Sequence, residues 1–141
     1  MSLNLLVRLI TPEAKCPTKA NEHALGFDLY SAETVKIPAR YHILVGTRIS
    51  VELPEGYGAI IFDRSSVGSK GVHRHGGVID NDYRGEIFVD MWNISRQQYE
   101  VHQGDRIAQL VLIPSPMCEA KVVDSLTATL RDTKGYGSTG R

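Results

Sequence analysis

Short apolar runs, broken by Gly, Pro, Asn or Asp roughly every eight to twelve residues, constrain the fold of this chain more than any other feature. Such runs cover residues 3–10, 41–53, 57–62, 86–94, 99–102 and 106–113. In the second run, alternate residues share one face at the period of a strand, namely Val45, Thr47, Ile49 and Val51. Many short strands at this spacing predict an all-β fold, a distorted jelly-roll or β-barrel.

The 141 residues fit a single domain, and no stretch has the length and period of a long amphipathic helix. The best helical candidate is a turn or two at residues 65–70. Residues 125–141 differ from the rest because they combine few large apolar side chains with three glycines. We therefore predict a core domain over residues 1–124 and a mobile carboxy-terminal arm over residues 125–141.

Charge balance, apolar run lengths and cysteine spacing each limit the possible partners and location of this protein. Lys plus Arg equals Asp plus Glu, 16 against 16, which argues against stable nucleic-acid binding. No apolar run approaches the roughly 18 residues of a membrane span, and the amino terminus lacks the features of a secretory signal. We expect an intracellular protein, cytoplasmic or nuclear. Cys16 and Cys118 lack metal-ligand spacing, so we predict two buried free thiols.

Two segments have residues suited to a phosphate or a cation. Asp28 lies among alternating apolar residues, where it is either an outward-facing strand residue or a carboxylate near a hydrated cation. Arg64, Ser65 and Ser66 occupy a strand-to-turn junction. A guanidinium fork and two hydroxyls can surround a phosphate, although a solvated turn has the same composition. The spacing of a P-loop is absent.

The segment at residues 76–87 carries the best general-base candidate, Asp80. Gly76 and Gly77 precede a strand-like triplet and a turn sequence, so we predict a hairpin whose exposed backbone reads a flat base edge. Asp80 and Asp82 could instead be turn-capping carboxylates.

Two further segments complete the set. In residues 104–110, the Asp105-Arg106 pair suggests a structural turn, and Gln109 is a secondary ligand candidate. In the arm, an aromatic ring is flanked by glycines, with Arg before it and hydroxyls after it. These residues suit a lid in which Tyr136 stacks on a base, while phosphate oxygens are met by Arg131, Ser138 and Thr139.

These five segments, in this order, resemble the five motifs of the trimeric dUTPase family across essentially the whole chain. The combination of Gly-Val-Ile-Asp-x-Asp-Tyr-Arg-Gly with a terminal Gly-Tyr-Gly-Ser-Thr-Gly is very specific. The Ser-Ser-Val-Gly-Ser-Lys-Gly stretch and the Tyr in the arm look most like compact viral members. The resemblance implies a jelly-roll homotrimer with an exchanged C-terminal arm, which hydrolyses dUTP to dUMP and pyrophosphate with Mg2+. This reaction keeps uracil out of DNA and supplies dUMP for thymidylate synthesis.

The resemblance also implies a role for each motif residue. Asp80 would activate the water that attacks the α-phosphorus, and Tyr83 would lie under the deoxyribose and exclude a ribose 2′-hydroxyl. Asp28 would contact Mg2+ through water. The remaining residues would bind substrate: Gly77, Val78 and Ile79 at uracil, Arg64, Ser65, Ser66 and Gln109 at the phosphates, and Arg131, Tyr136, Gly137, Ser138 and Thr139 from the arm of a neighbouring subunit.

Two departures from the family pattern bear on the site. Asp63 stands where the family usually has Pro or Gly, and it would weaken triphosphate binding if it pointed inward. The stretch His73-Arg74-His75 replaces the usual apolar run, which makes the uracil contacts the least secure. The His-x-His pair could suggest a metal site, but a solvated turn is the commoner explanation.

Two rival functions differ in class. A dCTP deaminase shares the fold and the Arg-Ser-Ser segment, and it needs a catalytic Glu where this chain has the shorter Asp90. Ammonia release from dCTP would favour it. A non-enzymatic interaction module of the same fold usually loses its catalytic motifs, whereas all five are legible here.

Overall fold

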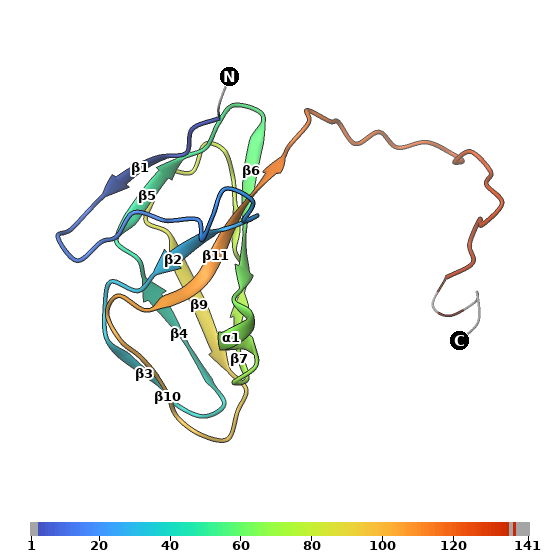
Figure 1. Cartoon of the computed structure of the whole chain (residues 1–141). Helices are drawn as coiled ribbons and strands as arrows, with labels where there is room; N and C mark the ends of the chain where they lie inside the picture. Colours follow the sequence, from blue (N-terminus) through green and yellow to red (C-terminus); the bar gives the residue numbers. More distant parts are fainter. Residues whose placement is uncertain (1–2, 136, 138–141) are drawn as a thin grey trace.

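The computed structural model describes residues 3–135 and residue 137, and within them it contains eleven strands and one short helix (Figure 1). The elements in chain order are β1 (Leu6–Leu9), β2 (Phe27–Tyr30), β3 (Val35–Ile37), β4 (Tyr41–Gly46), β5 (Ile49–Glu52), β6 (Tyr57–Asp63), α1 (Ser65–Gly68), β7 (Val72–His75), β8 (Val78–Ile79), β9 (Phe88–Asn93), β10 (Tyr99–Val101) and β11 (Arg106–Pro114). The predicted all-β class is confirmed.

The strands form four antiparallel sheets, and their order places distant segments side by side. A four-stranded sheet has the order β2-β11-β6-β8, and a three-stranded sheet has the order β4-β9-β7. Two pairs complete the fold, β1 with β5 and β3 with β10. Over the described residues these sheets do not merge into one closed barrel, so the open jelly-roll alternative describes the fold better than a β-barrel does.

The alternating face at residues 45–51 is buried as predicted, but it belongs to two strands rather than one. Val45, Ile49 and Val51 are at most 2% exposed. Between them the chain breaks at Arg48, whose φ of 54° lies in the left-handed region that β-strands do not use. As a result β4 pairs with β9, whereas β5 pairs with β1.

Two strands were not predicted, because their sequences lack a clear apolar run. β7 has the sequence Val-His-Arg-His, and only Val72 of this strand is buried. It is held by pairing with β9, which is a tertiary effect invisible in the local pattern. β3 has three residues and pairs with β10.

The predicted burial of the two cysteines is wrong. Both thiols are free, but Cys16 and Cys118 are exposed. Cys16 lies in an irregular segment where its neighbours Ala14 and Pro17 take the buried positions. Cys118 follows the last strand, where the chain has already left the core.

The carboxy-terminal segment runs away from the sheets (Figure 1). β11 ends at Pro114, and residues 114–134 are all exposed in the single chain. The exposed segment therefore begins about ten residues before the boundary that composition indicated. No helix in the described part of the chain is long and apolar enough to cross a membrane.

Candidate functional site

Three of the five motif segments line one pocket, which we call the anion pocket. Its volume is about 240 Å³. It lies where β2 and β11 pass the junction between β6 and α1, because β11 pairs with both β2 and β6. The predicted residues that line it are Asp28, Arg64, Ser65, Ser66 and Gln109. The prediction that the first, second and fourth motif segments converge is consistent with this arrangement.

Asp28 is held between two guanidinium groups. Its Oδ1 accepts a hydrogen bond from Arg64 Nε at 3.1 Å, and its Oδ2 lies 3.5 Å from Arg106 Nη1. The Asp28 side chain is only 16% exposed, so Asp28 is not simply an outward-facing strand residue. Arg106 is a pocket residue that the sequence analysis had assigned to a structural turn.

The start of α1, the Gln109 amide and Gly26 form the rest of the anion pocket. Arg64 occupies the N-cap of α1, so Ser65 and Ser66 begin its only turn and remain exposed. Gln109 donates through Nε2 to the carbonyl of Asp63 at 2.9 Å. A Cβ on Gly26 would lie 2.8 Å from Gln109 Oε1, so a larger residue here would displace the Gln109 amide.

Asp63 does not add its charge to the anion pocket. Its Oδ1 accepts a hydrogen bond from the backbone N–H of Arg74 at 2.7 Å, and its Oδ2 lies 2.9 Å from His73 Nδ1. The carboxylate therefore ties β6 to β7, which explains how a polar strand is fixed at this place.

Among the described residues, no cluster of three or more His, Cys, Asp or Glu side chains could hold a metal ion.

The third motif segment lines a second pocket, which we call the strand-edge pocket. Its volume is about 380 Å³, and its walls come from the outer faces of β4 and β9 and from the segment around β8. Predicted residues in its lining are Gly77, Val78, Ile79, Asp80 and Tyr83. Glu86, Phe88 and Asp90 also line it.

The predicted hairpin is wrong in its pairing. β8 pairs with β6, at the edge of the four-stranded sheet, and not with a strand beyond the Asn81-Asp82 turn. Gly76 and Gly77 have φ values of 60° and 95°, and they carry the chain from one sheet to the other. A Cβ on Gly77 would lie 3.0 Å from Ile61 Cβ, so close packing also requires this glycine.

The edge position of β8 leaves one residue's backbone free to bind a ligand. Ile61 N–H donates to Gly77 C=O at 2.8 Å, and the register pairs Ile60 with Val78. In an antiparallel ladder the residue between two bonded positions directs its N–H and C=O away from the partner strand. Val78 therefore presents one donor and one acceptor at the open edge, as the sequence analysis expected of this segment.

Asp80 and Tyr83 lie close together at the mouth of the strand-edge pocket. Both are exposed, and a turn joins them through a hydrogen bond from Tyr83 N–H to Asp80 C=O at 3.1 Å. The Tyr83 hydroxyl donates to the main-chain carbonyl of Glu86 at 2.8 Å. Asn81, in contrast, has a structural task, because its amide donates to the carbonyls of Pro54 and Tyr57.

Asp90 and His75 belong to the wall of the same pocket. Asp90 Oδ1 lies 2.8 Å from His42 Nδ1 across the β4–β9 pair. The Trp92 ring is stacked between His42 and His75, with centroid separations of 5.1 and 4.8 Å. Asp90 thus interacts with a histidine of the neighbouring strand. His75 stacks on Trp92 and does not form a metal-binding pair with His73 in this structure.

The described residues of the arm are placed apart from both pockets. Arg131 donates through Nε to the carbonyl of Lys134 at 2.9 Å within a local turn, and Gly137 has a φ of 84°. Tyr136, Ser138 and Thr139 lie outside the described residues. On one chain, therefore, the motif residues form two separate pockets and a detached arm.

The two pockets together define a class of protein. One is lined by arginines, hydroxyls and an amide that suit an anion, and the other combines a free strand edge with a carboxylate and a tyrosine ring. A phosphate chain and a flat base fit these two environments, so the class is a nucleotide-binding protein of all-β fold.

The chain belongs to the dUTPase family, because the family model described as dUTPase matches residues 12–140. A deoxyuridine 5'-triphosphate nucleotidohydrolase of Candida albicans is 43% identical over 98% of this chain and 89% of the relative. The protein of the same name from Variola virus is 42% identical over 99% of this chain and 97% of its own length.

Solved structures agree with this assignment. The dUTPase of Staphylococcus bacteriophage 80alpha with dUPNHPP has a TM-score of 0.92 at 28% identity, over 98% of this chain and 99% of that one. A mutant dUTPase from phage phi11 of S. aureus, whose structure concerns the coordination of a structural Mg(II) ion, has a TM-score of 0.83 at 27% identity. It covers 89% of this chain and 99% of its own.

Proposed function

We propose that this chain hydrolyses dUTP to dUMP and pyrophosphate. The observation that carries the proposal is the strand-edge pocket, in which the free backbone of Val78, the carboxylate of Asp80 and the ring of Tyr83 lie together. Family membership supports the same reaction, since the relatives are named for it.

Base selection rests on Val78. Its N–H and C=O match an acceptor and a donor on the edge of uracil. Cytosine exchanges a donor for an acceptor at that edge, so a buried group would be left unpaired, and sites of this kind discriminate by roughly 10⁴–10⁵. Gly77 and Ile79 fix the register that aims this backbone outward.

Asp80 positions and deprotonates the attacking water. Water attacks the α-phosphorus, the bond to the bridging oxygen breaks, and pyrophosphate leaves with the electron pair. The proton goes to the Asp80 carboxylate, which is exposed at the pocket mouth and close to the ring assigned to the sugar. Tyr83 supports the deoxyribose and leaves no room for a 2′-hydroxyl.

The anion pocket binds the phosphate chain. Arg64 with Ser65, Ser66 and Gln109 supplies donors, and a phosphate that competes for Arg64 would release one oxygen of Asp28. A single carboxylate fits Mg2+ only if the ion arrives with the triphosphate and keeps its waters, which is the ordinary habit of this ion. Bound there, Mg2+ would neutralise charge on the phosphates, with Asp28 contacting one of its waters.

A homotrimer joins the parts that one chain keeps apart. The anion pocket of one subunit faces the strand-edge pocket of the next, and the exposed arm of a neighbour closes over the nucleotide. Arg131 then meets the terminal phosphate, Tyr136 stacks on uracil, and Gly137, Ser138 and Thr139 line the phosphate chain. The separation of the two pockets and the exposure of residues 114–134 support this arrangement.

The test is pyrophosphate release from dUTP, dCTP, dTTP and UTP, with Mg2+ and with EDTA. We expect far faster release from dUTP than from the other three nucleotides, and a strong dependence on Mg2+. Ammonia release from dCTP would support the deaminase alternative through Asp90, and no reaction with any of the four would contradict the proposal.

A further inference from the structure

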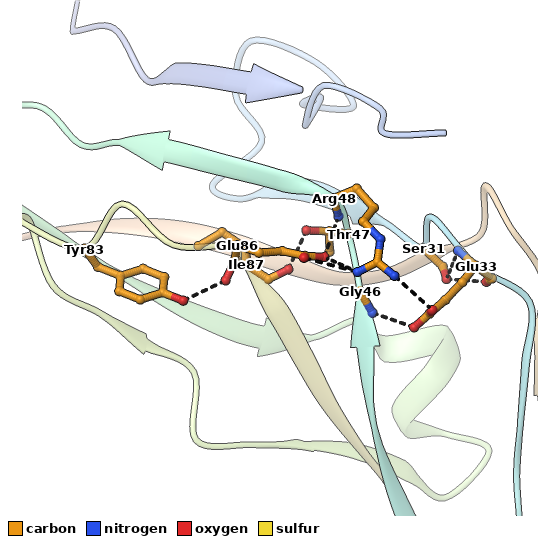
Figure 2. A network of polar contacts seen from close by, with 8 residues as sticks. All are labelled: Ser31, Glu33, Gly46, Thr47, Arg48, Tyr83, Glu86 and Ile87. Atoms are coloured by element: carbon orange, nitrogen blue, oxygen red, sulfur yellow. Dashed lines mark hydrogen bonds and ion pairs between the residues drawn. The ribbon is translucent and has the colours of Figure 1, made fainter. Parts of the chain in front are cut away.

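A chain of polar contacts runs from Tyr83 through Glu86 to Arg48 and Glu33 (Figure 2). The Tyr83 hydroxyl donates to the main-chain carbonyl of Glu86 at 2.8 Å. The Glu86 carboxylate in turn accepts from Arg48 Nη1, at 2.8 Å through Oε1 and at 3.1 Å through Oε2. Arg48 lies in the break between β4 and β5, so the contacts connect the pocket with a distant part of the sequence.

Arg48 is held in an unusual backbone conformation by the same carboxylate. Its φ is 54°, a region that non-glycine residues rarely adopt, and its N–H donates to Glu86 Oε1 at 3.0 Å. The hydrogen bond to Glu86 raises the pKa of Arg48, and the nearby charge of Glu86 adds to this effect. One carboxylate thus binds both the backbone and the side chain of Arg48.

Two glycines leave the room that these contacts need. A Cβ on Gly46 would lie 2.6 Å from Arg48 Nη1 and 2.9 Å from Glu86 Oε1. A Cβ on Gly85 would overlap the Tyr83 hydroxyl. The ring of Tyr83 therefore folds over Gly85 to reach the carbonyl beyond it, and its position depends on where residues 85–87 lie.

The far end of the chain of contacts is anchored to the core. Glu33 Oε2 lies 3.5 Å from Arg48 Nη2, and Glu33 Oε1 accepts from Gly46 N–H at 2.8 Å. Ile87, which follows Glu86, is fully buried and donates its N–H to Ile49 at 2.9 Å. The ring of Tyr83 is thus the exposed end of an arrangement whose other members are fixed.

We propose that the Arg48–Glu86 ion pair is a positioning device for Tyr83, which sets the ring where it selects deoxyribose over ribose. This inference rests on the proposed function. Arg48 and Glu86 act through Tyr83, because the Tyr83 hydroxyl donates to the backbone carbonyl of Glu86 and not to its carboxylate.

Selectivity, rather than overall stability, is the property this ion pair should control. The Arg48 side chain is 35% exposed and the Glu86 side chain 17%, and ion pairs with a partly exposed member contribute little to unfolding free energy. A small shift of the 85–87 backbone would nevertheless move the ring away from the sugar, and discrimination between two sugars depends on that contact.

The test compares kcat/KM for dUTP and for UTP in the wild-type protein and its variants, using pyrophosphate release. Arg48→Met and Glu86→Ala should each raise the UTP-to-dUTP ratio by about fivefold to tenfold, the size of a coupling between contacting groups. Glu86→Gln keeps an acceptor for the Arg48 N–H but removes the charge of the ion pair, so it should raise the ratio less than Glu86→Ala. The matched control is Glu100→Ala on β10, which should leave the ratio unchanged.

A double-mutant cycle separates positioning from a general structural effect. Tyr83→Phe removes the hydroxyl that reaches Glu86, so adding Glu86→Ala to it should change the ratio little further. Fully additive effects, or an unchanged ratio in both Arg48→Met and Glu86→Ala, would overturn the inference. If Glu86→Ala fails to fold, Arg48→Met with Tyr83→Phe provides the same comparison. A wild-type protein without activity on dUTP would contradict the proposed function itself.

Discussion

The anion pocket offers charged side chains to a ligand, whereas the strand-edge pocket offers backbone groups. The anion pocket is built from charged side chains that already bind one another, with Asp28 between Arg64 and Arg106. The strand-edge pocket relies on backbone groups that a sheet holds in place before any ligand arrives. In the anion pocket, a phosphate must replace Asp28 as a partner of the arginines, whereas the backbone of the strand-edge pocket is already in place. Substitutions should therefore affect the two pockets differently.

The largest effect should come from the strand-edge pocket. Asp80→Asn removes the base and keeps the shape, so turnover of dUTP should fall by about 10²–10⁴-fold, the typical contribution of a general base. Binding of dUTP should change little. Stopped assays for turnover and calorimetry for binding check this, and lost binding with retained turnover would refute the role of Asp80.

The next effect concerns the arm, which belongs to neither pocket of its own chain. A variant that ends at residue 130 should lose about 10-fold to 100-fold in kcat/KM, the value of one aromatic stacking contact on a base. Its thermal stability should be unchanged, since residues 114–134 are exposed. A fully active truncated protein would show that the arm is not a lid.

The anion pocket should respond to Asp28→Asn in an unusual direction. Removal of this carboxylate frees Arg64 and Arg106, so inorganic pyrophosphate without Mg2+ should bind roughly fivefold more tightly. The benefit of Mg2+ for turnover should decrease. Weaker binding of pyrophosphate would indicate that Asp28 holds Arg64 in its binding position.

A smaller effect should separate Asp63 from the anion pocket altogether. Asp63→Ala removes the acceptor of the Arg74 N–H, so unfolding free energy should fall by about 1–2 kcal/mol. Because Asp63 faces β7, the KM for dUTP should stay the same. Denaturant unfolding and steady-state kinetics on one preparation test both statements, and a lower KM would place the charge at the phosphates.

The smallest effect lies outside both pockets. Burial raises the pKa of the Tyr99 hydroxyl above its ordinary 10.0, the Asp105 charge raises it further, and Arg64 opposes them. A raised pKa in the folded state means that the neutral phenol stabilises the fold below about pH 10, and this stabilisation disappears as pH rises through the higher folded value. Melting temperatures of the wild type and Tyr99→Phe should therefore diverge only above pH 10.

The sequence predicted the fold class and most of the motif residues that line the two pockets. Alternation marked the strands that carry the core, residue chemistry marked Asp80 and Arg64, and the family resemblance added Tyr83. Strand pairing was less accessible. β7 and the edge position of β8 depend on partners far along the chain, so no local signal distinguished an edge strand from a hairpin.

The residues that the sequence analysis missed are those whose partners are distant. Arg106 faces Asp28, and Arg48 binds Glu86 across a separation that no spacing rule covers. Two signals were nevertheless present. Glycines at 46 and 85 lie beside the contacts that they make possible, and a charged residue interrupts an otherwise apolar run at Arg48.

The open edge of β8 has an evolutionary consequence. A base that is read by the main chain of Val78 is read without regard to which side chain stands there, so drift at this position leaves the choice of base untouched. A preference for another base would require β8 to shift its register against β6. A shift by one residue would move every side chain of β8 to the opposite face of the sheet. Under the proposed function, mutations in this segment should therefore abolish dUTP hydrolysis more readily than they change the base that the protein prefers.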